Sequence, residues 1–372
     1  MNKRGLGVGL VGSGFMGKCH ALAWLNVAAV FGDVAAPRLV ALADATPDLA
    51  AQKAREFGFA ESTGTWRDLL QRDDIDIISI TTPNEFHPEM AIAALEAGKH
   101  VWCEKPMATS LAAATSMRDA ASVAGKTAAL GYNYIQNPLI RQVKALLADK
   151  VIGDINHVRF EMDEDYMADP LTPFTGRSAA SAGYGALDDF GVHPLSLILT
   201  LLGKATRVFG DMRKPYATRP DGKGTRAVDN FDIATALMEL EGGAQVTLSC
   251  NRSAWGRKGR IFMQIFGNKG TLAYDQERLN EVQLFVNDGP VATQGFRTII
   301  SGPAHAPYGR FVPAPGHQLG FNDLKTIECR EVLRAVAGEP AHLISFAEGL
   351  HIEATVHAIA RAAAEGRWLA VG

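Results

Sequence analysis

The chain has 372 residues, more than one hydrophobic core usually supports, so the sequence predicts two domains. With 47% hydrophobic residues, 21% charged residues and a formal net charge of -3, the composition excludes a disordered chain and argues against nucleic acid as a partner. The cysteines form no CxxC pair, which argues against a metal cluster or a disulfide framework, and we expect no metal site. They are Cys19, Cys103, Cys250 and Cys329.

The first apolar stretch, Leu6–Val11, is short and broken by glycines, which predicts a buried strand rather than a signal peptide. No other run approaches the roughly 18 apolar residues of a membrane span. We therefore expect a soluble, cytoplasmic protein with no membrane partner.

From residue 6 to residue 131, short apolar runs alternate with helical patterns, which is typical of βαβ units and a parallel sheet. The expected strands are Leu6–Val11, Leu39–Asp44, Ile75–Thr81, His100–Cys103 and Thr127–Leu130. The clearest helices, Pro88–Ala97 and Leu111–Ala124, are each followed by a glycine, which is the expected stop signal.

In the remaining chain, β-rich segments joined by turn residues predict a separate α+β domain with a large, mainly antiparallel sheet. The expected strands are Ile155–Met162, Thr206–Met212, Phe231–Leu240, Ala244–Ser249, Arg260–Phe266 and Val282–Val286. Two long loops, Asp163–Gly185 and Gly302–Gly316, are candidates for function, and helices are expected over Phe321–Ala337 and Phe346–Glu365. We place the two domains at residues 1–131 and 132–372.

A glycine-rich motif follows the first strand and opens a helix; it reads Gly12-Ser13-Gly14-Phe15-Met16-Gly17. A lone GxGxxG is weak evidence, but this position between a strand and a helix is the one that dinucleotide binding requires. Gly12 permits the tight turn, Gly14 lets the backbone approach a pyrophosphate, and Gly17 lets the helix pack against the strand. We therefore predict an NAD(P)-binding Rossmann domain rather than a purely structural glycine turn.

Asp44 ends the second expected strand, beyond the usual acidic position about 20 residues after the first glycine. An insertion that contains Phe31-Gly32-Asp33 and Pro37 explains the difference. A carboxylate here accepts hydrogen bonds from ribose hydroxyls and repels a 2′-phosphate, so we predict NAD rather than NADP. A solvated aspartate at a strand end is the alternative.

Two further segments point to a family. The first contains Thr82-Pro83-Asn84, His87 and Glu104-Lys105-Pro106, and the second is Gly185-Ala186-Leu187-Asp188-Asp189-Phe190-Gly191-Val192-His193. Together with the glycine-rich motif they resemble the Gfo/Idh/MocA family, named for glucose–fructose oxidoreductase and inositol dehydrogenase. The resemblance spans the whole chain and implies an NAD(P)-dependent oxidoreductase that acts on CH–OH groups.

The resemblance assigns the family's catalytic lysine and histidine to Lys105 and His193. Oxidation of a secondary alcohol removes a hydride from carbon and a proton from oxygen, so the site needs a base and a hydrogen-bond donor at the hydroxyl. His193 is expected to accept the proton, while Lys105 hydrogen-bonds the same oxygen and contacts the nicotinamide ribose. Asp189, four residues before His193, is expected to orient the imidazole or a sugar hydroxyl. An exposed lysine and a structural histidine are the alternatives.

Further cofactor contacts are expected around the same segments, and they are Thr82, Pro83, Asn84, His87, Glu104 and Lys105. The amide of Asn84 is a candidate contact to the cofactor. His87 is either structural or a wall of the nicotinamide pocket.

Substrate recognition departs from the family at one position. Many members carry an aspartate three residues after the histidine, where this chain has Ser196, so other groups must hold the substrate. The candidates are Asn133, Tyr134, Arg177 and His317, with Lys105, Asp189 and His193.

The expected substrate is a cyclic polyol or a sugar, an inositol such as scyllo-inositol or a pyranose, with the scyllo-inositol dehydrogenase type favoured. The alternatives are an anhydrosugar, a ketosugar or a dihydrodiol as substrate, or a non-catalytic NAD(P)-binding sensor or co-repressor. A large sheet with one open face also predicts a homo-oligomer, a tetramer or a dimer, through the C-terminal sheet.

Overall fold

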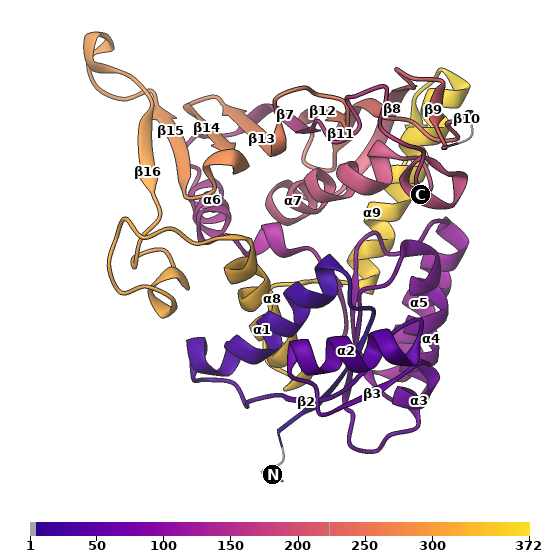
Figure 1. Ribbon diagram of the computed structural model, residues 1–372. Helices are drawn as coiled ribbons and strands as arrows, with labels where there is room; N and C mark the ends of the chain where they lie inside the picture. The colour runs from indigo at the N-terminus through magenta and orange to yellow at the C-terminus, as the bar shows by residue number, and fades with distance from the viewer. Residues whose placement is uncertain (1–4, 223) are drawn as a thin grey trace. The chain divides into compact units, whose positions relative to one another are not determined.

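The computed structural model describes residues 5–222 and 224–372 (Figure 1). The chain divides into two compact units, each of which contains one large sheet. The first unit comprises the described residues up to Gln136 together with Gly320–Leu350. The second comprises Asn137–Leu319 together with His351–Gly372.

The sheet of the first unit has seven strands in the order β17-β6-β5-β4-β1-β2-β3. Strands β1 to β6 run parallel, and β17 pairs antiparallel with β6. The strands are β1 Gly7–Val11, β2 Arg38–Ala43, β3 Glu61–Thr63, β4 Ile77–Ile80, β5 His100–Glu104, β6 Ala128–Gly131 and β17 Ile344–Ser345. The order reverses beside β1, and ligands of such open sheets bind beyond the carboxyl ends of the strands at that point.

The helices of the first unit cover this sheet. They are α1 Phe15–Phe31, α2 Pro47–Phe57, α3 Arg67–Leu70, α4 His87–Glu96, α5 Leu111–Ala124 and α8 Phe321–Val336. Helix α1 packs against α8, and α4 packs against α5. Strands β1 and β4 are buried along their whole length, as expected for a parallel sheet that is covered on both faces.

The sheet of the second unit has nine strands in the order β16-β15-β14-β13-β7-β12-β11-β8-β18. Its neighbours pair antiparallel except β7 and β12, which are parallel. The strands are β7 Ile155–Glu164, β8 Ala205–Arg213, β11 Ile233–Leu240, β12 Gln245–Asn251, β13 Lys258–Gly267, β14 Gly270–Asp275, β15 Glu281–Val286, β16 Arg297–Ile300 and β18 Leu369–Ala370. Two short strands, β9 Thr218–Pro220 and β10 Thr225–Ala227, form a separate ladder.

One face of the nine-stranded sheet is covered. Buried and more exposed residues alternate along β11, which is the pattern of a strand with one covered face. Helix α7, Val192–Leu202, packs against β7, and Ile359 of helix α9, Phe346–Glu365, meets Gly210 of β8. Figure 1 shows α7 and α6, Pro138–Ala148, on the same side of this sheet. The short 3-10 segments outside the site are η4 Ala180–Ala182, η6 Gln276–Arg278, η7 Val291–Thr293 and η8 Tyr308–Arg310.

The predicted fold class is confirmed, because a mainly parallel sheet covered by helices is followed by a large, mainly antiparallel sheet. The division into units differs from the predicted boundary at residue 131, since residues 132–136 and 320–350 group with the first unit. The reason is long-range pairing that local patterns do not reveal: Ile344 of β17 pairs with Leu130 of β6, and α8 packs against α1. Within the described residues, no helix has the length and apolar character needed to cross a membrane.

Candidate active site

The turn between β1 and α1 has the geometry that the glycine-rich motif predicts. Gly12 has a φ of 89°, which side chains rarely adopt, and a Cβ there would lie 2.9 Å from the carbonyl oxygen of Thr81. A Cβ on Gly17 would lie 2.3 Å from the carbonyl oxygen of Gly12, so glycine is needed where α1 packs against the turn. A Cβ on Gly14 would meet no described atom within 4 Å, so open space adjoins this glycine.

The amino end of α1 can accept an anion. The helix begins at Phe15, its N-cap Gly14 provides no side-chain cap, and its first turn carries no acidic residue. The first backbone N–H groups and the positive end of the helix dipole are therefore suited to a phosphate. With the open space at Gly14, this turn fits the pyrophosphate of a dinucleotide. Phe15 is 73% exposed beside it, and Met16 is half-buried.

Asp44 follows β2 and its carboxylate is fixed against the same turn. One oxygen accepts hydrogen bonds from the backbone N–H of Ser13 at 2.8 Å and from its hydroxyl at 2.5 Å. The other accepts the backbone N–H of Ala45 at 2.7 Å. A carboxylate held at the end of the second strand, beside the glycine-rich turn, fits the predicted contact to ribose hydroxyls.

The loop after β4 carries Thr82, Pro83 and Asn84, of which Thr82 and Asn84 are half-buried and Pro83 is exposed. Asn84 begins the short 3-10 segment η1, Asn84–Phe86, and α4 starts at His87. The His87 ring is fully buried, with Nδ1 2.8 Å from the carbonyl oxygen of Pro106 and Nε2 3.0 Å from that of Thr82. Burial lowers the pKa of His87. The structure thus places this predicted cofactor contact between the loops after β4 and β5, where it joins them.

Glu104, another predicted cofactor contact, is the last residue of β5. Its carboxylate is buried, with Oε1 2.9 Å from Nε2 of His20 on α1 and 2.7 Å from Nζ of Lys325 on α8. The ammonium of Lys325 lies 2.7 Å from the carboxylate of Glu328, and Nδ1 of His20 lies 2.6 Å from the hydroxyl of Ser79. We call these five residues the Glu104 cluster. The Glu104 carboxylate is thus bonded in the interior to the Lys325 ammonium and the His20 ring.

Burial governs the charges in the Glu104 cluster. It lowers the pKa of His20 to about 4 and raises that of Glu328 to about 7. Burial also opposes the charge on Glu104, but Lys325 and His20 hold the pKa of Glu104 well below its usual range. A neutral His20 that donates from Nε2 to Glu104 and accepts from Ser79 satisfies both of its ring nitrogens.

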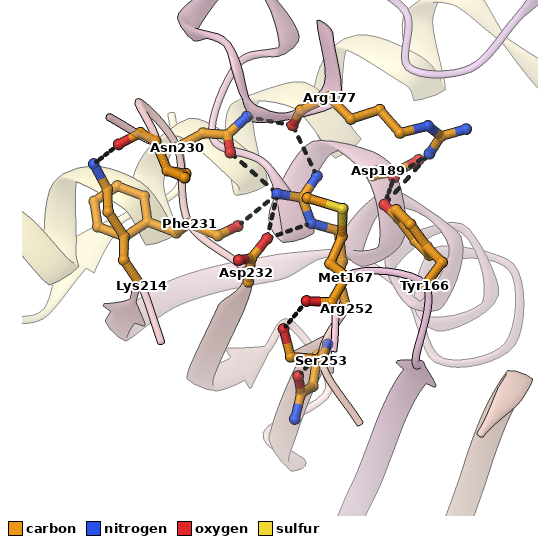
Figure 2. A network of polar contacts seen from close by, with 12 residues as sticks. Tyr166, Met167, Arg177, Asp189, Lys214, Asn230, Phe231, Asp232, Arg252 and Ser253 are labelled. Atoms are coloured by element: carbon orange, nitrogen blue, oxygen red, sulfur yellow. Dashed lines mark hydrogen bonds and ion pairs between the residues drawn. The ribbon is translucent and has the colours of Figure 1, made fainter. Parts of the chain in front are cut away.

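In the second unit, Asp189 lies in a π-helical turn, Leu187–Gly191, that runs directly into α7. Turns of this kind often occur at functional sites. One carboxylate oxygen of Asp189 accepts the hydroxyl of Tyr166 at 2.5 Å and Nη1 of Arg177 at 2.7 Å. The guanidinium also lies 5.1 Å from the centre of the Tyr166 ring. We call Tyr166, Arg177 and Asp189 the Asp189 group; Figure 2 shows its members converging.

Two separately predicted residues, Arg177 and Asp189, are therefore brought together, and Tyr166 is a partner that the sequence did not single out. The charge of Asp189 raises the pKa of Arg177, and burial together with Asp189 raises that of Tyr166. The side chain of Arg177 remains 60% exposed and that of Asp189 is 24% exposed. A ligand can therefore meet a carboxylate acceptor and a guanidinium donor side by side.

Arg177 lies in the 3-10 segment η3, Gly176–Ser178, and hydrogen bonds from two buried side chains fix its backbone. Its carbonyl oxygen accepts Nδ2 of Asn230 at 2.8 Å and Nη1 of Arg252 at 3.2 Å. Arg252 in turn pairs with the buried Asp232 at 2.7 Å, and Figure 2 shows these bonds beneath Arg177. A buried ion pair thus fixes the loop that carries an exposed guanidinium.

His193 lies in the first turn of α7 and is 6% exposed. Ser196, at the position where many family members carry an aspartate, is fully buried, and its hydroxyl donates to the carbonyl oxygen of His193 at 2.7 Å. Ser196 therefore bonds to the helix backbone. Lys105 is half-buried directly after β5, at the sheet edge where ligands of such folds bind.

The remaining predicted substrate contacts are dispersed. Asn133, in the 3-10 segment η2 Asn133–Gln136, is 2% exposed, and its Nδ2 has no hydrogen-bond partner among the described residues. Tyr134 packs its ring edge-on against Phe321, with the ring centroids 6.0 Å apart. His317 is exposed, and its backbone carbonyl oxygen accepts the hydroxyl of Tyr308.

Sequence patterns could have revealed part of what was missed. Lys325 and Glu328 stand three residues apart on α8, and both are buried, as is Leu324. Two opposite charges on the apolar face of a predicted helix signal a buried ion pair. For Tyr166 there is no comparable signal, because it lies in an irregular loop.

The described fold and glycine-rich turn define an NAD-binding oxidoreductase, and comparison with known proteins agrees. Residues 6–132 match the family model described as "Oxidoreductase family, NAD-binding Rossmann fold", and residues 140–273 match "GFO/IDH/MocA C-terminal domain". The chain belongs to the Gfo/Idh/MocA family of oxidoreductases. This confirms the resemblance, the enzyme class and NAD as the cofactor.

Two of the similar proteins are dehydrogenases that act on a sugar or a polyol. The chain is 34% identical to levoglucosan dehydrogenase of Pseudarthrobacter phenanthrenivorans, with 98% of both chains covered. It is 29% identical to inositol 2-dehydrogenase of Rhizobium meliloti, with 76% of this chain and 79% of the relative covered. A structure of levoglucosan dehydrogenase in complex with NADH and levoglucosan superposes with a TM-score of 0.95 at 35% identity over 99% of both chains. The family is one of NAD-dependent sugar and polyol dehydrogenases, and the scyllo-inositol type is not specifically supported.

Proposed function

We propose that this protein oxidises a secondary hydroxyl of a pyranose sugar with NAD, and that anhydrosugars such as levoglucosan are the first class to test. The observation that carries the proposal is the similarity, over nearly the whole of both chains, to a levoglucosan dehydrogenase. Serine at position 196 supports it as well. A buried serine that bonds to the helix backbone offers no carboxylate to an inositol ring.

The proposed catalytic groups are Lys105, Asp189 and His193. The glycine-rich turn and Asp44 would hold NAD, which when bound would supply the acceptor for the hydride of the substrate carbon. His193 takes the hydroxyl proton, and Lys105 donates a hydrogen bond to the same oxygen, which stabilises negative charge as the proton leaves. Asp189, fixed by Tyr166 and Arg177, supplies an acceptor for a neighbouring hydroxyl.

Arg177 is the proposed substrate contact that the geometry supports most directly. A sugar hydroxyl both donates and accepts, and the exposed guanidinium beside a carboxylate offers the two complementary groups together. Asn133 is a second proposed contact, because a buried amide nitrogen without a partner costs roughly 1–3 kcal/mol unless a ligand or water accepts from it. We also propose that subunits associate through the open face of the nine-stranded sheet, which sedimentation of the full chain tests.

The test is NADH formation from a panel that contains levoglucosan, glucose, xylose, myo-inositol and scyllo-inositol, each with NAD and with NADP. Lys105→Ala and His193→Ala should each lower kcat roughly 100- to 10,000-fold while NADH binding persists. The matched control is Lys144→Ala, which removes an exposed lysine of α6.

Preference for an inositol would overturn the substrate class, and full turnover by Lys105→Ala would overturn the assigned role. NADH binding without turnover of any compound would favour the non-catalytic sensor.

A further inference from the structure

The Glu104 cluster is a buried polar feature of the first unit that the proposed chemistry does not use directly. His20, Ser79 and Lys325 are fully buried, and Glu104 and Glu328 are 4% and 2% exposed. The cluster joins α1, β4, β5 and α8, which lie far apart in the sequence. Trp102 packs against it, with its ring centroid 3.7 Å from that of His20 and 5.2 Å from the ammonium of Lys325.

Stability alone does not explain such a cluster. Removing an ammonium and a carboxylate from water costs several kcal/mol for each ion, and apolar residues of similar volume often stabilise a core equally well. Lys325 lies 2.7 Å from Glu104 and 2.7 Å from Glu328, so the cation is placed with specific geometry rather than left in a loose apolar pocket. The question is therefore what that geometry fixes.

The two oxygens of Glu104 face different partners. Oε1 meets Lys325 and His20, and Oε2 accepts the backbone N–H of Lys105 at 3.3 Å. Glu104 is the last residue of β5, so this bond acts on the first peptide group after the strand. The next residue is held as well, because the carbonyl oxygen of Pro106 lies 2.8 Å from Nδ1 of His87. The backbone on both sides of the Lys105 side chain is thus hydrogen-bonded to a buried residue, Glu104 or His87.

We propose that Lys325 is a positioning residue for Lys105: its ammonium fixes one oxygen of Glu104, and the other oxygen fixes the backbone from which the Lys105 side chain extends. The inference rests on the proposed function, in which Lys105 contacts the reacting oxygen. A misplacement of about 1 Å at a reacting group can lower a rate by about 100-fold. A residue of α8 therefore sets the rate of a reaction that its own side chain does not touch.

The primary test compares Lys325→Met with Lys99→Met in the full chain. Lys99 is the matched control, since it is 9% exposed in the same unit, but its ammonium donates to the carbonyl oxygens of Arg72 and Ile75, at 2.7 and 2.9 Å. Lys325→Met should lower kcat about 10- to 100-fold and change KM for NAD less than about threefold. Lys99→Met should destabilise the fold without lowering kcat. Equal kcat losses in both variants would overturn the proposal.

A double-mutant cycle tests the route through Glu104. If Lys325 acts through this carboxylate, then Lys325→Met combined with Glu104→Gln should lower kcat no further than the more damaging single change. Additive losses would overturn the proposal. If Lys325→Met does not fold, Lys325→Arg takes its place, because it keeps the buried charge and moves the donor atoms.

Crystal structures of Lys325→Met and Lys99→Met separate this inference from the proposed function, because they need no turnover. A displaced Lys105 backbone in Lys325→Met alone supports the positioning role, and an unmoved backbone refutes it. If Lys105 moves and kcat with an identified substrate is unchanged, then the catalytic role of Lys105 fails while its positioning by Lys325 stands.

Discussion

The Glu104 cluster and the Asp189 group both hold a carboxylate beside a cation, but the first is buried and the second is partly exposed. In each, a cation holds a carboxylate: Lys325 holds Glu104 from 221 residues away, and Arg177 holds Asp189 from 12 residues away. The first pair is buried, whereas the side chain of Arg177 is 60% exposed. Buried charges fix the backbone around them, while exposed charges remain available to a ligand. We therefore assign positioning to the Glu104 cluster and recognition to the Asp189 group.

The dominant influence on pKa also differs between His20 and Glu328 in the first region and Arg177 in the second. In the Glu104 cluster burial is the largest influence, and it lowers the pKa of His20 to about 4 and raises that of Glu328 to about 7. For Arg177 the largest influence is the charge of Asp189, which raises its pKa. Changes to His20 or Glu328 should therefore appear in stability and its pH dependence, whereas Lys325→Met should also lower kcat. Changes to the Asp189 group should appear in catalysis.

The largest expected effect is a loss of stability, and it comes from the buried ion pairs that support the loop of the Asp189 group. Asp232 pairs with Arg252 at 2.7 Å and lies 3.4 Å from Arg219. Asp232→Ala leaves two buried guanidinium groups without their carboxylate, which should destabilise the protein by roughly 3–5 kcal/mol in urea unfolding. The control is Asp211→Ala, which removes an exposed partner of Arg213 and should change stability by less than about 0.5 kcal/mol. Equal effects of the two variants would show that the exposed group does not rest on a buried one.

The next largest effect is expected in the pH dependence of the free energy of unfolding. His20 and Glu328 of the Glu104 cluster contribute to it with opposite signs. The folded-state pKa of His20 is lowered from 6.5, so its contribution to stability is present above pH 6.5 and is lost as the pH falls toward 4. The folded-state pKa of Glu328 is raised from 4.5, so its contribution is present below pH 4.5 and is lost as the pH rises through 7. In the wild-type protein these two contributions oppose each other across the same window.

Single variants should expose each slope, at roughly 1 kcal/mol per pH unit relative to the wild type. His20→Gln should lose stability as the pH rises from 4.5 to 7, and Glu328→Gln should lose it as the pH falls from 6.5 to 4. Urea midpoints measured across this window check both signs. The other titratable neighbours are Glu104, Lys325, Cys19 and Cys329, and burial raises the pKa of both thiols, which keeps them neutral here. Parallel profiles in both variants would refute the assignment.

How much of the structure the sequence could predict depends on how far apart in the chain the contacting residues lie. The glycine-rich turn and the strand and helix around it are local, so the spacing of Gly12, Gly14 and Gly17 was sufficient to predict the turn. The side-chain partners of Glu104 could not be predicted, because His20 and Lys325 lie 84 and 221 residues away. An acidic residue beside a lysine at the end of a strand has the same local pattern whether it faces a cofactor or the interior.

The second unit shows the same limit. Arg177 and Asp189 were each predicted as substrate contacts from loop composition and motif, but their pairing needs a fold that closes 12 residues of irregular chain. Tyr166, 23 residues before Asp189, has no periodicity to mark it. The boundary between the units was also out of reach, because β17 contributes two residues to a sheet that begins more than 300 residues earlier.

The smallest effect on stability, and the sharpest contrast, is expected in the Asp189 group. Tyr166→Phe removes one hydroxyl donor to the Asp189 carboxylate and keeps the ring. If the group serves recognition, kcat/KM for the identified sugar should fall about tenfold to 100-fold, since about 1.4 kcal/mol corresponds to a factor of ten. Arg177→Gln should act in the same direction, with urea midpoints of both variants close to the wild type because the changes are partly exposed.

Arg226→Gln is the control, since its exposed guanidinium lies 4.0 Å from the centre of the Phe174 ring, and it should leave kcat/KM unchanged. If Tyr166→Phe lowers the urea midpoint and leaves kcat/KM intact, the Asp189 group is a structural brace like the Glu104 cluster, and exposure does not separate recognition from positioning in this protein.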